Sequence, residues 1–240
     1  MHVWGLYQQN VGINQIQASG YVMCWAAKWY GEKDIRFSSI KKAGAEKMLT
    51  AIHKLVDAAD VVVHFNGTRF DMPTLNKEFI TYKMKPPAPY KQVDLYRTAR
   101  DQFRFPSNKL DYISQALGLG KKVRHTGHEL WTRCMANDAT AWREMEAYNR
   151  HDVVLLEKLY DKMRPWIKTH PNHGLYTEAD DTKPAACTNC GGTRLNRRGY
   201  ARTVANVYAR FQCNSCGSWL RGGKPVNTKK DRANLVRRAT

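Results

Sequence analysis

The chain has 240 residues, a formal net charge of +18 at pH 7, 42% hydrophobic residues and seven tryptophans. This composition excludes general disorder, because the chain can bury a sizeable core. No apolar run approaches the ~20 residues that span a bilayer, so we expect no membrane partner. The first residues lack the features of a signal peptide, and the expected location is intracellular, cytoplasmic and reducing.

The positive charge is concentrated near the C-terminus. From Lys183 to Thr240 the chain holds 13 lysine and arginine residues and one acid, Asp231, so +12 of the net +18 lies there. Basic charge gathered on a small module usually indicates a phosphate-bearing partner. A tail that only improves solubility or adheres to ribosomes is the alternative.

The first quarter of the chain predicts strands followed by a helix. Val3–Ile16 alternates loosely, Gly20–Tyr30 is a more apolar strand and Ile35–Ser38 can be a third, in the pattern of an antiparallel meander. Glu46–Ala58 then carries apolar residues at helical spacing. This helix leads directly into the next apolar strand.

A buried strand and a helix then meet at a turn that carries an acid. Val61–Val63 is a β-branched run, Asn66-Gly67 is a turn pair, and Met72–Ile80 can form a helix. Asp71 is thereby placed at a strand-to-helix junction, at the rim of a sheet, where α/β folds place much of their chemistry. A helix cap is the alternative role for this carboxylate.

A possible partner for that acid lies on a later helix. Tyr148 and Asp152 stand four residues apart in EAYNRHDVVLLEKL, and this spacing puts both side chains on one face of a helix. Leu155, Leu156 and Leu159 continue that face into a core. The sequence therefore predicts a buried helix that presents a phenol and a carboxylate together.

Between these two elements the chain offers other polar candidates. Asp94 is interpreted as a cap or a surface ion pair. Phe103–Gly120 has the start and stop signals of a helix, and Lys109 near its start is a candidate phosphate contact. His125 and His128 lie in a basic loop; a metal site is conceivable, and a phosphate-contacting or solvated loop is favoured.

Three segments taken together resemble a known family. VVVHFNGTRFD, FPSNKLDYISQALGLG and YNRHDV are similar to motifs of the DEDD (DnaQ-like) 3′–5′ exonucleases, in the RNase H-like superfamily that includes family B DNA polymerase proofreading domains. The resemblance covers about Met1 to His170 and is specific in combination. It implies an α/β fold with an RNase H-like mixed sheet and flanking helices, and hydrolysis of terminal phosphodiesters at a 3′ end.

The same resemblance implies roles for individual residues. Asp71 and Asp152 match two of the four carboxylates with which this family holds two Mg²⁺ or Mn²⁺ ions. Tyr148 matches the residue that orients the attacking water. Asn66 and Phe70 match contacts to the terminal nucleotide.

The first carboxylate motif of the family is missing. It should end the first strand as Asp-x-Glu, but residues 1–31 contain no acid, and Glu32-Lys-Asp34 has the reverse order in a predicted turn. Three explanations are open. A strand upstream of this sequence was left out, a partner polypeptide supplies it, or the protein is an inactive pseudo-exonuclease that binds nucleic acid or a replication partner.

Two CxxC turns indicate a second module built on a metal. Cys187-Thr-Asn-Cys190 and Cys213-Asn-Ser-Cys216 are each followed by glycine and are separated by 22 residues, a strong signal for a structural zinc ribbon. A segment this short cannot fold by burial alone, so zinc would act as its core. A redox dithiol pair is the alternative.

The predicted organisation has four parts: an exonuclease domain at 1–172, a linker at 173–184, the zinc ribbon at 185–222 and a basic tail at 223–240. Arginines interleaved with Tyr200, Tyr208 and Trp219 in the ribbon predict a nucleic-acid surface. Those assigned to it are Arg197, Arg198, Arg202 and Arg210. DNA is favoured over RNA as the partner, and a prokaryotic or viral source is expected.

Overall fold

The computed structural model describes residues 12–16, 19–175, 185–233 and 235. The chain forms two compact units, residues 1–161 and 162–240, which are described one at a time. Within the described residues, no helix combines the length and the apolar character needed to cross a lipid bilayer. The strand predicted over Val3–Ile16 lies largely outside the described residues, and Ile13–Gln15 is a short 3-10 helix.

The first unit alternates strands and helices. In chain order its elements after that short helix are β1 (Cys24–Ala27), β2 (Arg36–Ser39), α1 (Ile40–Ala43), α2 (Ala45–Asp57), β3 (Val61–His64), α3 (Asp71–Thr81), β4 (Lys91–Asp94), α4 (Leu95–Gln102), α5 (Leu110–Ala116), α6 (His128–Met135) and α7 (Ala139–Met163), the last of which runs to the unit boundary. The mixed α/β architecture is the one predicted.

The described strands of this unit form two separate pairs. β1 and β2 pair antiparallel, as the predicted meander requires. β3 and β4 pair parallel, with Val61 opposite Lys91 and His64 opposite Asp94. Each pair is a two-stranded sheet of its own within the described residues. β1 and β3 therefore each have one edge without a described partner strand.

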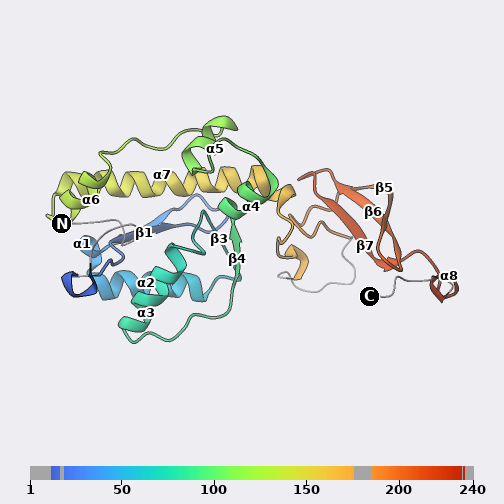
Figure 1. Ribbon diagram of the computed structural model, residues 1–240, viewed down its shortest axis with the longest axis horizontal. Coiled ribbons are helices and arrows are strands. Elements are labelled where there is room, and N and C mark those ends of the chain that lie inside the picture. The colour runs from blue at the N-terminus through green and yellow to red at the C-terminus, as the bar shows by residue number, and fades with distance from the viewer. Residues whose placement is uncertain (1–11, 17–18, 176–184, 234, 236–240) are drawn as a thin grey trace. The chain divides into compact units, whose positions relative to one another are not determined.

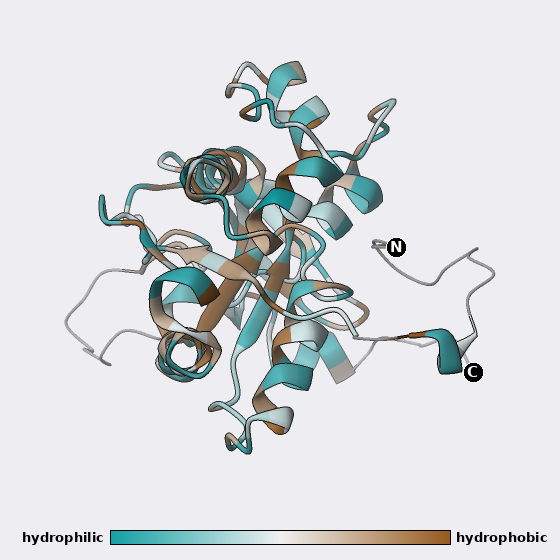
Figure 2. Ribbon diagram, turned by 90° about the vertical axis from the view of Figure 1, so that its left-hand side faces the viewer, coloured by the Kyte–Doolittle hydropathy of each residue, from teal (hydrophilic) through white to brown (hydrophobic). Residues whose placement is uncertain are grey.

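Helices cover the strands of the first unit on two sides. Figure 1 shows β1 and β3 between α7 on one side and α2 with α3 on the other. The strand ribbons at the centre are brown in Figure 2, whereas the outer turns of the surrounding helices are teal. This layering follows from the apolar stripe of each helix, which is buried against the strands.

Two apolar clusters hold the helices in place. Ile52 and Val56 of α2 pack with Met72 and Phe79 of α3, and all four side chains are buried. A second cluster joins α6 to α7; its buried members are Leu130, Cys134, Ala141, Trp142 and Met145. Tyr148 packs against this second cluster, so its position on α7 is fixed by core contacts.

The predicted helix over Phe103–Gly120 is shorter in the structure. α5 occupies only Leu110–Ala116. Pro106 has no backbone N–H and precedes the helix, while Gly118 ends it with φ 68°. The other helix predictions are confirmed within a residue or two, since α2 and α3 begin at Ala45 and Asp71.

The second unit is a three-stranded antiparallel sheet with short helical segments. Its elements are two short 3-10 helices (Arg164–Trp166 and His173–Leu175), β5 (Leu195–Arg202), β6 (Val207–Cys213), β7 (Trp219–Pro225) and α8 (Lys229–Ala233), and the strand order is β5-β6-β7. β7 therefore extends beyond residue 222, where the basic tail was predicted to begin. The predicted linker lies mostly outside the described residues.

Candidate functional site

The turn between β3 and α3 fixes the position of Asp71. Asn66 adopts φ 64°, and its backbone N–H donates to Asp94 Oδ1 over 2.8 Å. The Gly67 N–H donates to His64 Nδ1 over 3.1 Å, and a Cβ on this glycine would lie 2.6 Å from His64 Cγ. Only glycine fits so close an approach. Asp71 then begins α3.

Asp94 supports this turn from the neighbouring strand. The side chain is only 8% exposed, and its Oδ1 also accepts a hydrogen bond of 3.1 Å from Tyr96 N–H, which caps α4. Its Oδ2 lies 3.7 Å from His64 Nδ1. The prediction of a cap is confirmed. The prediction of a surface ion pair is wrong, because the carboxylate is buried under the turn.

The environment of Asp71 disfavours its charged form. Burial raises the pKa of the Asp71 carboxyl, and the negative charge of Asp94 adds to the rise, against opposing contributions from His64 and the Asp71 backbone. The residue keeps substantial access to solvent, through the cavity that it lines. A cation placed beside this carboxylate would relieve both unfavourable contributions.

Tyr148 and Asp152 share one face of α7, as predicted, and a lysine joins them. Lys122 Nζ lies 2.5 Å from Asp152 Oδ2 and 3.1 Å from Tyr148 Oη. Burial works to lower the pKa of the Lys122 ammonium, but these two partners outweigh it and the pKa is raised. The backbone N–H of Lys122 donates to Asp111 Oδ1 over 2.7 Å, which fixes the loop before α6.

One oxygen of Asp152 has no protein partner. Asp152 Oδ1 is buried and accepts no hydrogen bond from any described residue. Burial and the charge of Asp152 raise the pKa of Tyr148, whereas Lys122 works to lower it, so the phenol stays protonated at neutral pH. The face of α7 therefore presents a neutral hydroxyl and a carboxylate with one free coordination position.

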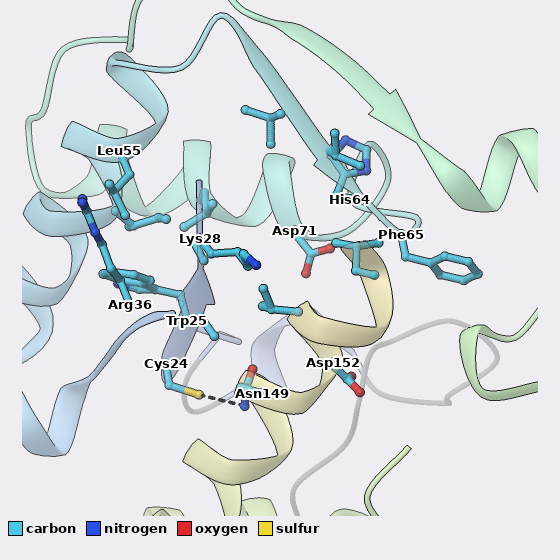
Figure 3. Close-up of a pocket in the computed structure, with 18 of the residues that line it drawn as sticks. Cys24, Trp25, Lys28, Arg36, Leu55, His64, Phe65, Asp71, Asn149 and Asp152 are labelled. Atoms are coloured by element: carbon cyan, nitrogen blue, oxygen red, sulfur yellow. Dashed lines mark hydrogen bonds between the residues drawn. The ribbon is translucent and has the colours of Figure 1, made fainter. Parts of the chain in front are cut away.

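All three predicted catalytic residues line one cavity of about 800 Å³. Figure 3 shows Asp71 at the start of α3 and Asp152 on α7, with the Asp152 carboxylate directed away from that of Asp71. The cavity walls include β1 and the Val61–Val63 run of β3, each of which has one edge without a described partner strand. Asp71, Tyr148 and Asp152 therefore line the same cavity, which is also bordered by β1 and β3.

Of the three predicted nucleotide contacts, only Phe70 lines this cavity. Phe70 is 63% exposed and lines the cavity. Asn66 lies in the supporting turn, outside the lining, and Lys109 is an exposed residue just before α5. The sequence also missed a pair on the cavity wall, Lys28 Nζ and Glu157 Oε2, which lie 2.5 Å apart.

The histidine loop packs on aromatic rings. The His125 ring centroid lies 4.6 Å from that of Tyr148 and 5.3 Å from that of Trp131. Among the described residues, the only group of three or more metal-binding side chains is a set of four cysteines. His125 therefore forms part of the wall behind Tyr148, and a metal site shared with His128 is not supported.

The four cysteines of the second unit form that metal-binding group. Cys187 and Cys213 are buried, all four Sγ atoms lie within 4.8 Å of one another, and the Cys187–Cys216 and Cys190–Cys213 distances are both 3.7 Å. A tetrahedral zinc site with Zn–S bonds of ~2.3 Å requires S–S distances of about 3.8 Å. The separation is far too long for disulfides, which need about 2 Å. The cluster fits zinc.

The predicted arginines lie on exposed strands of the same unit. Arg197, Arg198 and Arg202 are on β5, and Arg210 is on β6. Arg197 Cζ lies 5.4 Å from the Tyr200 ring centroid, and Arg210 Cζ lies 5.1 Å from that of Trp219. Sequence reasoning missed Arg221 of β7, whose Cζ lies 4.5 Å from the Tyr208 ring.

The family comparison agrees with this architecture. The sequence model of a family described as the RNase_H superfamily matches residues 16–164. No curated protein matches the chain. Among solved structures, the family B DNA polymerase from the hyperthermophilic archaeon Pyrobaculum calidifontis is similar, with 19% identity and a TM-score of 0.47. The similarity covers 55% of this chain and only 20% of that polymerase.

Proposed function

The chain belongs to the RNase H superfamily, and on this basis we propose that it is a 3′–5′ exonuclease that hydrolyses terminal phosphodiester bonds of nucleic acid by a two-metal mechanism. The observation that carries the proposal is the meeting of Asp71, Tyr148 and Asp152 in one cavity. They come from two elements far apart in the chain.

The residues present fit divalent metal ions. Mg²⁺ and Mn²⁺ prefer carboxylate oxygens, and the cavity offers Asp71, whose pKa is raised by burial, and Asp152, whose Oδ1 has no described partner. Such ions, when bound, supply an activated water and stabilise the leaving oxygen. Asp71 and Asp152 would hold them from opposite elements.

The remaining roles follow from position. Tyr148, which contacts the His125 ring and Lys122, would orient a water molecule through its hydroxyl. Phe70 stands exposed on the cavity rim, where an unpaired terminal base can stack on its ring. Asn66 and Lys109 would contribute to nucleotide binding from outside the lining.

The two carboxylates that match the family motifs are few for two metal ions, and the edges of β1 and β3 that lack a described partner strand offer a place for more. Both strands border the cavity. A strand inserted between them would gain backbone hydrogen bonds on both sides and would bring its own side chains next to Asp71. We propose that such a strand, from an upstream segment or from a partner polypeptide, completes the metal site.

The ion pair of Lys122 favours a second candidate function. With Lys122 Nζ at 2.5 Å from Asp152 Oδ2, the carboxylate is already neutralised, and a metal ion would have to displace the ammonium. A protein that keeps this pair intact would bind nucleic acid without cleaving it. A catalytically inactive, replication-associated pseudo-exonuclease is therefore the alternative.

An assay of labelled DNA shortening distinguishes the active exonuclease from the inactive pseudo-exonuclease. Single-stranded DNA labelled at its 5′ end would be incubated with Mn²⁺ and either the present chain or the chain extended by the codons directly upstream of Met1. We expect a ladder of 3′-shortened products from the extended protein, little from the present chain, and none after Asp152→Asn. An extended protein that binds DNA but leaves it intact would establish the inactive alternative. Trimming that survives Asp152→Asn would contradict the assigned site.

A further inference from the structure

One face of the second unit's sheet carries two interlocked pairs of arginine and aromatic side chains. On this face Arg210 and Arg221 are direct cross-strand neighbours, and Trp219 lies opposite Gln212. Because residues two apart on a strand share a face, Tyr208 lies beside Arg210. The contacts run diagonally: Arg221 stacks over Tyr208 at 4.5 Å and Arg210 over Trp219 at 5.1 Å.

This face is open and uniformly positive. Arg210 and Arg221 are exposed, and the Trp219 side chain is 56% exposed. The sequence from Cys187 to Lys230 contains no aspartate or glutamate, so no carboxylate within that segment balances the two guanidinium groups. Two like charges placed directly opposite each other destabilise a sheet. An anionic ligand would remove that cost.

From this arrangement we infer that the β6–β7 face is a binding platform for single-stranded nucleic acid. Trp219 and Tyr208 offer ring faces on which unpaired bases can stack, and the adjacent arginines are placed to contact the backbone phosphates between them. A duplex cannot use the platform in this way, because its base faces are already covered by neighbouring base pairs. Strand-selective binding follows.

The platform goes beyond the proposed nuclease, because it requires no metal ion at Asp71 or Asp152. It shares Tyr208 and Trp219 with the surface predicted from the sequence but differs in its arginines. Arg210 was among those assigned there, whereas Arg221, which takes the second position, was not. Arg197 and Tyr200 lie opposite Phe211 and Ala209, on the other face of the sheet.

That other face provides a matched control. Arg197 and Tyr200 form the same kind of pair, at 5.4 Å, and Tyr200 is 43% exposed, close to the value for Trp219. Trp219→Ala can therefore be compared with Tyr200→Ala, and Arg210→Ala/Arg221→Ala with Arg197→Ala/Arg202→Ala, which removes the same charge from the other face. Zinc content of each purified protein would show that the ribbon is folded.

The test is fluorescence anisotropy of a labelled oligothymidylate and of a duplex of equal length, with the zinc-loaded full chain and no added Mg²⁺ or Mn²⁺. We expect Trp219→Ala to weaken single-strand binding about tenfold or more and to change duplex binding less than twofold. Trp219→Phe, which keeps a ring, should recover most of the affinity. Tyr200→Ala should have little effect on either ligand.

Salt dependence separates stacking from charge. Trp219→Ala should leave the slope of log K against log salt unchanged, whereas Arg210→Ala/Arg221→Ala should reduce it by about 1.4, at ~0.7 per phosphate contact on a single strand. Equal losses for Trp219→Ala and Tyr200→Ala, or equal losses on single strand and duplex, would overturn the platform. Because binding is measured without hydrolysis, either result stands apart from the nuclease proposal.

Discussion

The cavity of the first unit and the cysteine cluster of the second gather their polar groups in opposite ways. Asp71, Lys122 and Asp152 come from three distant segments, and each depends on its own hydrogen bonds and packing for position. The four thiols come from two short turns and are close enough to share one ion. The residues of the second site therefore lie within one short segment, whereas those of the first site are positioned by contacts between distant parts of the chain.

The largest expected effect comes from removing the shared ion. Cys187→Ser together with Cys190→Ser should unfold the second unit, because zinc binding supplies most of the folding free energy of so small a module. The first unit should keep its fold, since its clusters contain none of these cysteines. Hydrogen exchange measured segment by segment would detect the difference. Equal loss of protection in both units would show that they fold as one.

The next effect tests how Asp152 is held. Lys122→Met should destabilise the first unit by about 2 kcal/mol in urea denaturation, less than the 3–5 kcal/mol of a fully buried pair, because both side chains keep about a quarter of their exposure. Lys121→Met, at an exposed neighbour, should cost less than about 0.5 kcal/mol. Similar losses of unfolding free energy in the two variants would mean that the Lys122–Asp152 ion pair does not stabilise the first unit.

The same pair predicts a pH dependence. Because the pKa of Lys122 is raised in the fold, its contribution is fully present below its unfolded pKa of about 10.4 and is lost as the pH rises through the folded value. The stability difference between the natural chain and Lys122→Met should therefore shrink in strongly alkaline buffer. A difference that stays constant there would assign the effect to packing.

The turn below Asp71 can be broken by one methyl group. Gly67→Ala should destabilise the first unit by about 1–2 kcal/mol, because the new Cβ meets the buried His64 ring. Gly20→Ala, where nothing lies within 4 Å, is the matched control. Thermal unfolding followed by circular dichroism measures both. If Gly67→Ala leaves the thermal stability unchanged, the turn accommodates the new Cβ without cost.

The smallest effect concerns Asp71 itself. Its raised pKa means that the folded state prefers the protonated carboxyl, so Asp71→Asn should raise Tm at pH 7 by about 1–3 °C, an effect kept small by solvent access. The gain should vanish as the pH falls below the unfolded pKa of about 3.9. Asp60→Asn, at an exposed site of the same region, should change neither. A fall in Tm would show that the folded state does not disfavour the charged Asp71 carboxylate.

Local patterns in the sequence predicted much of this architecture. The Asn66-Gly67 turn, the helix after Asp71 and the four-residue spacing of Tyr148 and Asp152 each depend on neighbouring residues, and each is found. The cysteine cluster was equally predictable, since its ligands and their turns lie within one short segment. The turns and helices that carry both sites could therefore be predicted from residues that are close together in the sequence.

Tertiary pairing determined the rest. Lys122 looked like one residue of a solvated basic loop, and only the path of α7 brings Asp152 to its ammonium. Asp94 looked like a surface acid, but the parallel pairing of β3 with β4 buries it under the turn. Arg221 was missed because its partner Tyr208 is on another strand, and the register decides the face.

Locating metal ions directly is the most decisive measurement for the cavity. Anomalous diffraction would be recorded at the manganese and zinc edges from crystals of the zinc-loaded extended protein, which carries the completing strand, soaked in Mn²⁺. The nuclease proposal predicts a manganese peak between the carboxylates of Asp71 and Asp152, with Lys122 Nζ moved away from Asp152, while zinc stays on the four cysteines. A cavity free of manganese at saturating concentration, with the Lys122–Asp152 pair intact, would contradict it.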